Sequence, residues 1–266
     1  MLLQDAMDRF VRNQMLTDAE QGKLAEACMD SMADYLLHYS DLFQDDPGDA
    51  DESPLADWEQ ALDAHMGELM DGDAESGADL YGLELEQLEP EHLRDFFGWH
   101  LLREIGGDAT AIEEYVQIMH QWLAFLTEKG KISPSRYLEF LSVVDELAPD
   151  CERAAKAARL LFHFVRLGSG ISPRLRGQRF SRFIEGHARI ATVEAHQIFL
   201  SFDNQEERIG PVPLAGGITG LLKPGDVLDV ELGLRADVWM MVDIGPVYPA
   251  SVYVEAEVFE PLRRES

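Results

Sequence analysis

Cysteine is scarce in this sequence, and long apolar runs are missing from it. No run of about 18 or more apolar residues occurs, so we expect no membrane span. The first residues, Met1–Asp5, lack a basic region followed by an apolar core, so we expect no secretory signal there. The chain has two cysteines, Cys28 and Cys151, and both fall in helical patterns. Two thiols that nothing pairs favour a reduced, cytoplasmic protein.

Signatures of catalysis are also missing. The sequence has no G-x-x-x-x-G-K-[ST] phosphate loop, no H-E-x-x-H motif, no G-x-S-x-G elbow and no C-x-x-C pair. Gly168 and Gly170 begin like a dinucleotide-binding turn, but Pro173 stands where the third glycine belongs. We therefore predict no catalytic residue and no cofactor, and we expect a protein that is not an enzyme.

The sequence also offers little support for a metal site. His92, His100 and the other histidines are scattered, and we expect them to be partly exposed rather than ligands. An acidic stretch from Asp73 to Glu84 has carboxylates at several positions that a calcium-binding loop uses. Ala78 stands where such a loop needs glycine for its sharp turn. We therefore predict a solvated acidic loop and no metal.

Basic residues are scarce in the first third of the chain. Residues 1–90 hold 24 Asp or Glu against three Arg or Lys, and the whole chain carries a formal net charge of −28. A surface of this kind repels nucleic acid and anionic membranes over most of its extent. It attracts basic proteins through long-range forces that weaken with salt. We therefore expect a protein partner and no membrane, with nucleic acid disfavoured overall.

The sign of the charge reverses over residues 166–189, which hold six arginines against one acid. Guanidinium groups bind phosphate or carboxylate through paired hydrogen bonds, and aromatic rings stack on bases. Two interpretations stay open: these arginines neutralise the chain's own carboxylates, or they bind an external anionic ligand. The candidate anion contacts are Arg174, Arg176, Arg179 and Arg182, and the candidate stacking residues are Phe180, Trp239 and Tyr248.

Apolar residues recur at three- and four-residue spacings through the first part of the chain, which predicts an acidic α-helical domain over residues 1–165. Thr17 and Glu20 have the spacing of a capping box, and Ser133 precedes a first-turn proline. The expected helices begin near Met1, after Thr17, at Leu55, at Pro90, after Asp108 or Thr110, after Ser133 and near Pro149.

After Gly168 the apolar period changes from 3.6 to 2. Leu228, Val230 and Leu232 alternate with Asp229 and Glu231, which is typical of an antiparallel sheet with one buried face. The expected strands are Arg189–Val193, Gln197–Phe202, Arg208–Leu214, Val227–Leu234, Val238–Asp243 and Ser251–Val258. We therefore predict an α+β chain: an α-helical N-terminal bundle, an Arg-rich connector over 166–186, and a small antiparallel β-barrel over 187–262.

The leading hypothesis is a non-enzymatic cytoplasmic interaction or adaptor protein whose acidic surface favours basic protein partners. The alternative is a nucleotide or RNA reader, in which connector arginines contact phosphate and barrel aromatics stack on a base. A third class, an enzyme whose carboxylates converge only in the folded chain, stays open as well.

Overall fold

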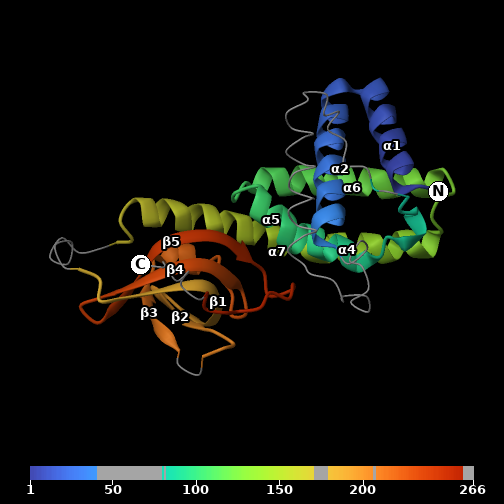
Figure 1. Ribbon diagram of the computed structural model, residues 1–266. Helices are drawn as coiled ribbons and strands as arrows, with labels where there is room; N and C mark the ends of the chain where they lie inside the picture. Colours follow the sequence, from blue (N-terminus) through green and yellow to red (C-terminus); the bar gives the residue numbers. More distant parts are fainter. Residues whose placement is uncertain (41–79, 81, 171–178, 206–207, 260–266) are drawn as a thin grey trace, which may run out of the picture. The chain divides into compact units, whose positions relative to one another are not determined.

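The computed structural model describes residues 1–40, 80, 82–170, 179–205 and 208–259 (Figure 1). The chain separates into two compact units, Met1–Leu88 and Glu89–Ser266. The predicted division at residue 165 follows the change of secondary structure and stays a prediction. The helix expected from Leu55 lies outside the described residues. So do residues 73–79 of the acidic stretch that resembles a calcium-binding loop.

The first unit contains helices α1 (Leu3–Thr17) and α2 (Ala19–Tyr39) and the short 3₁₀ helix η3 (Leu85–Gln87). A backbone hydrogen bond joins the start and the end of this unit, because the N–H of Leu3 donates to the carbonyl of Leu83 at 2.8 Å. Helix α2 buries the apolar stripe expected from its spacing, which includes Cys28, Met32 and Leu36.

The N-cap of α2 differs by one residue from the expected capping box. The carboxylate of Asp18, rather than the hydroxyl of Thr17, accepts hydrogen bonds from the N–H groups of Glu20 and Gln21. Thr17 ends α1, where its hydroxyl donates to the carbonyl of Asn13 at 3.0 Å. The two helices are therefore separated by the single extended residue Asp18, and the predicted Thr17 cap is wrong.

The helices of the second unit begin with α4 (Pro90–Asp95), which continues through the π-helical turn η4 (Phe96–His100) into α5 (Leu101–Glu104). Pro90 occupies the first turn as expected, because a missing N–H costs nothing there. Gly106 and Gly107 end the run with φ of +58° and +87°, a conformation that favours glycine. Helix α6 (Ala109–Glu128) follows, with Asp108 as its N-cap.

Helix α7 (Pro134–Arg166) is continuous for 33 residues, with Pro149 inside it. The predicted break at Pro149 is therefore wrong. An interior proline removes one helical hydrogen bond and costs about 3 kcal/mol. Helix α7 packs against α6 and also against the sheet, and this tertiary contact on both halves outweighs the local cost. The Ser133 cap of this helix is confirmed, because its hydroxyl accepts from the N–H of Arg136.

The sheet of the second unit has five strands in the order β3-β2-β1-β4-β5, all antiparallel. Its strands are β1 (Arg182–Glu194), β2 (Gln197–Ser201), β3 (Ile209–Pro213), β4 (Val227–Arg235) and β5 (Val238–Tyr248), and the one-turn helix α8 (Gly216–Thr219) follows β3. The α+β class is thus confirmed. The closed β-barrel is not supported, because no ladder joins β3 to β5 in the described ranges, although these two strands lie near each other.

The sixth expected strand, Ser251–Val258, forms no ladder of its own among the described residues. It makes one isolated bridge, between Gly186 and Val258, on the side of β1 away from β4. The N–H of His187 donates to the carbonyl of Glu257 at 2.9 Å, and that of Phe259 donates to the carbonyl of Glu185 at 2.8 Å. The segment therefore extends the edge of the sheet only beside the first half of β1, where β2 does not reach.

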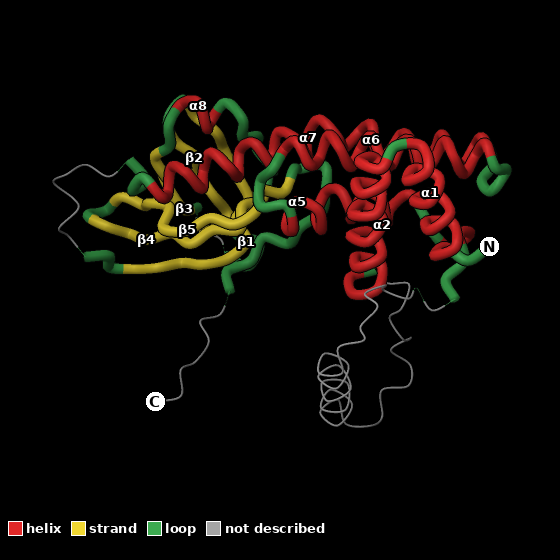
Figure 2. The backbone as a smooth tube through the Cα atoms, turned by 90° about the horizontal axis from the view of Figure 1, so that it is seen from above, coloured by secondary structure: helices red, strands yellow, loops and turns green. Residues whose placement is uncertain are grey.

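Helix α7 lies along the sheet beside β5 (Figure 2). The buried hydroxyl of Ser169, just after the helix, donates to the carbonyl of Met241 at 2.6 Å. Strand β3 is short and carries Pro211 and Pro213. In the part of the chain that the structure describes, no helix is both long and apolar enough to cross a membrane.

Candidate functional site

The solvent-facing side of the sheet carries a row of carboxylates. On β4, the alternation of side chains buries Leu228, Val230 and Leu232 and turns Asp229 and Glu231 to the other face. The same period places Glu185 on the outer face of β1, next to the buried Ile184. Asp243 is exposed on the neighbouring strand β5, so three adjacent strands contribute acidic side chains to one face.

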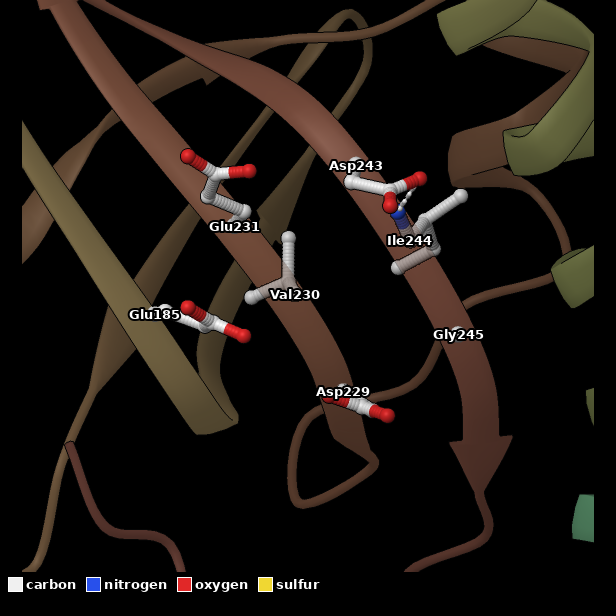
Figure 3. Close-up of a pocket in the computed structure, with 7 residues that line it drawn as sticks. All are labelled: Glu185, Asp229, Val230, Glu231, Asp243, Ile244 and Gly245. Atoms are coloured by element: carbon white, nitrogen blue, oxygen red, sulfur yellow. Dashed lines mark hydrogen bonds between the residues drawn. The ribbon is translucent and has the colours of Figure 1, made fainter. Parts of the chain in front are cut away.

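The register of the strands brings three of these acids into line. Glu185 of β1 lies directly opposite Glu231 of β4, and Glu231 lies directly opposite Asp243 of β5. Figure 3 shows the three carboxylates on one side of three adjacent strands, with Asp229 beside them. We call Glu185, Asp229, Glu231 and Asp243 the acidic row. Like charges in directly opposed positions destabilise a sheet, so this arrangement works against folding.

Burial and mutual repulsion perturb the ionisation of Glu231. Partial burial raises the pKa of its carboxyl above the ordinary value, and the charges of Glu185 and Asp243 raise it further. Both effects favour the protonated form, which carries no charge into this crowded position. A cation placed between these side chains would reverse the balance and return Glu231 to the ionised form.

Asp229 lies at one end of the acidic row, directly opposite His187 of β1. Burial is the main cause that raises the pKa of Asp229, and the charges of Glu185 and Asp243 add to it, while His187 and Arg103 act in the opposite direction. Its carboxylate lies over Gly245 of β5, where a Cβ atom would come 2.5 Å from Oδ2. Glycine at this position therefore makes room for the carboxylate.

The acidic row surrounds an open hollow of about 190 Å³, which Val230, Ile244 and Gly245 also line. Among the residues that the structure describes, no ion pair involves any member of the row. Asp243 accepts one hydrogen bond, from the N–H of Ile244 at 2.9 Å. Arg103 and His187 act on Asp229 at the end of the row, whereas only the like charges of Glu185 and Asp243 act on Glu231 at its centre.

The histidines and acids do not form a metal centre in the described ranges, where no group of three or more potential ligands is placed to hold an ion. His92 is buried, and its Nδ1 accepts from the N–H of Glu89 at 2.8 Å, which caps α4. His100 is buried as well. The expectation that these two histidines are partly exposed is therefore wrong, since both belong to the helical core.

The candidate arginines divide into two groups. Arg174 and Arg176 lie outside the described residues. Arg179 and Arg182 are exposed. Arg179 precedes β1, whereas Arg182 is its first residue, with its guanidinium 5.8 Å from the ring centroid of Trp239. Anion binding by Arg179 and Arg182 stays a prediction.

The candidate stacking residues already have partners within the chain. Phe180 lies against Phe183, with 5.1 Å between ring centroids, and the guanidinium of Arg235 lies 3.9 Å from the Phe180 centroid. Trp239 and Tyr248 are buried, and Tyr248 meets the ring of His187 edge-on. Burial raises the pKa of Tyr248 to about 12, with a further contribution from Asp229. These contacts leave both interpretations open, neutralisation of the chain's own carboxylates and binding of an external anionic ligand.

Sequence reasoning missed the acidic row as a unit. The alternation on β4 placed Asp229 and Glu231 on the wet face, and Asp243 ended an expected strand. Glu185 fell in the predicted connector 166–186, because β1 begins at Arg182 and not at the expected Arg189. The available signal was an acid at the same face of each neighbouring strand, which becomes visible once the strands are paired.

No protein-family model matches this chain, and neither a curated protein nor a solved structure matches it.

Proposed function

We propose that this chain is a non-enzymatic interaction or adaptor protein that binds a basic protein partner through the acidic row. The observation that carries the proposal is the position of Glu231, directly opposite both Glu185 and Asp243 with no cation supplied by the described residues. The mutual repulsion of these carboxylates lowers the free energy of unfolding. A lysine or arginine from a partner would relieve this repulsion.

The overall charge supports the same proposal. A net charge of −28 attracts a basic partner over distances longer than a single contact, and the row provides a defined place for it to dock. We place this function in the cytoplasm. The support for that location is that Cys28 and Cys151 are both free and buried, as in a protein kept reduced.

A titration with a short oligolysine peptide tests the proposal. We expect binding that weakens as salt rises from about 20 to 150 mM, because screening shortens the reach of the charges. The triple variant Glu185→Gln, Glu231→Gln, Asp243→Asn should bind at least about tenfold more weakly, which corresponds to about 1.4 kcal/mol.

A second triple variant controls for net charge alone. Glu114, Glu139 and Glu255 are exposed and lie outside the row, so changing them to Gln removes the same charge from other surfaces. This control should retain most of the affinity. Equal losses in the two variants would show non-specific attraction and would overturn the proposal, as would the absence of any peptide binding at low salt.

A further inference from the structure

A second hollow adjoins the acidic row at the edge of β5. It has a volume of about 270 Å³ and lies between α5, α7 and β5. Its wall is largely apolar and includes Leu102, Ala158, Phe162, Ile244 and Pro246, with Arg103 also on it. Small-molecule sites usually measure about 300–1,000 Å³, so this volume suits one large side chain better than a whole ligand.

The two hollows share Ile244 and Gly245 in their walls. Gly245 has no side chain to separate them, and the carboxylate of Asp229 lies directly over it. A bound peptide with an apolar side chain in the second hollow would therefore bring the cation of an adjacent lysine or arginine close to Asp229.

Arg103 determines which kind of side chain fits in the second hollow. It is held at the wall by Glu104, 4.0 Å from its Nε, and by the ring of Trp99, 5.6 Å from its guanidinium carbon. A lysine or arginine entering beside it would meet a like charge, whereas an apolar side chain would not. The apolar residue is therefore favoured in the second hollow, beside Phe162. The cationic residue is favoured at the acidic row, where four carboxylates outnumber the Arg103 charge that also acts on Asp229.

We propose that the second hollow receives an apolar side chain of the basic partner, so that the chain recognises a segment in which a large apolar residue adjoins lysine or arginine. This inference rests on the proposed function, because it assigns a second contact to the same partner. Burial of one leucine side chain contributes enough free energy to tighten binding by about tenfold or more.

Two peptides test the inference: a capped hexapeptide with two lysines and one leucine, and the same peptide with alanine in place of leucine. The wild-type chain should bind the leucine peptide about tenfold more tightly. Phe162→Ala removes one wall of the hollow and should abolish most of this preference. Leu160→Ala is the matched control, since Leu160 and Phe162 are both 42% exposed on α7 but only Phe162 lines the hollow.

Ala158→Leu provides a second variant, which fills the hollow instead of opening it and should also reduce the preference. A wild-type chain that binds both peptides with equal affinity would overturn this inference and leave the proposed function standing. Retention of the leucine preference in both Phe162→Ala and Ala158→Leu would overturn it too. If neither peptide binds to wild type, the proposed function fails, and the inference fails with it.

Discussion

Arg153 of α7 holds the carboxylate of Asp226, in the turn before β4, with two hydrogen bonds. Nη1 donates to Oδ2 at 2.7 Å, and Nη2 donates to Oδ1 at 2.9 Å. Asp226 has no solvent exposure, and it also accepts from the backbone N–H groups of Lys223 and Ala250. Nη1 of Arg153 donates as well to the carbonyl of Leu221 at 2.8 Å. One guanidinium thus joins the long helix to the sheet.

Loss of this guanidinium should be strongly destabilising. In Arg153→Ala the carboxylate of Asp226 stays buried without its charge partner, and breaking such a pair costs about 3–5 kcal/mol. We expect a corresponding fall in the free energy of unfolding, measured by urea denaturation. Arg159→Ala, at an exposed position of the same helix, should change it by less than about 0.5 kcal/mol. Equal effects of the two substitutions would contradict a structural role for the Arg153 pair.

Neutralising the centre of the acidic row should stabilise the fold. In Glu231→Gln the two like-charge pairs with Glu185 and Asp243 are removed, and we expect a gain of about 0.5–1 kcal/mol at pH 7. Thermal unfolding measures this gain as a higher Tm. Glu255→Gln, at an exposed position off the row, should leave Tm nearly unchanged. A lower Tm for Glu231→Gln would mean that a cation already neutralises the row.

The gain in Glu231→Gln should depend on pH in a defined direction. Because the pKa of Glu231 is raised in the folded chain, its ionised form opposes folding at pH values above that raised pKa. As pH falls through the raised pKa, Glu231 takes up a proton and the difference from the Gln variant shrinks. Below the ordinary glutamate pKa, 4.5, the difference should vanish. Unfolding curves from pH 7 to 4 check this, and a difference that grows toward acid would refute the assignment.

Both thiols should resist modification in the folded chain. Cys28 and Cys151 have no solvent exposure, and burial raises the pKa of each, so neither is a thiolate near neutral pH. An opening free energy of about 3 kcal/mol slows the reaction about a hundredfold. Reaction with a chromogenic disulfide should therefore be slow in buffer and rapid in urea. Fast labelling of either cysteine in buffer would show that its helix opens easily.

The corrected N-cap of α2 gives a paired test. Asp18→Ala removes the acceptor for two backbone N–H groups and should cost about 1 kcal/mol of unfolding free energy. Thr17→Ala removes a hydroxyl that donates back within α1, and it should cost less than about 0.5 kcal/mol. Urea denaturation of both variants compares the two positions. A larger loss in Thr17→Ala would restore the capping box that the spacing suggested.

Local patterns in the sequence predicted most of the elements and failed where tertiary contacts decide. The alternation around Val230 is a property of one strand, and it predicted β4 correctly. The effect of Pro149 depends on what α7 packs against, so a local rule predicted a break that packing on α6 and the sheet prevents. Barrel closure likewise depends on how edge strands β3 and β5 pair, which no short pattern reports.

The acidic row was beyond sequence reasoning for a similar reason. Glu185 and Glu231 are far apart in the chain, and their apposition depends on a register that the β1–β4 ladder sets. A shift of one residue would have turned Glu231 into the core face and Val230 outward. Register is fixed by the sum of many apolar contacts across the sheet, whereas alternation fixes only which face each side chain takes.

The prolines of β3 affect how this protein behaves at high concentration. An uncovered outermost strand usually offers backbone donors to a neighbouring molecule, which is a common start of aggregation. Pro211 and Pro213 have no N–H to offer, and a strand of five residues gives a docking chain little length to pair with. Backbone pairing between copies is therefore disfavoured at this edge, and the position of β3 near β5 leaves less of the edge accessible.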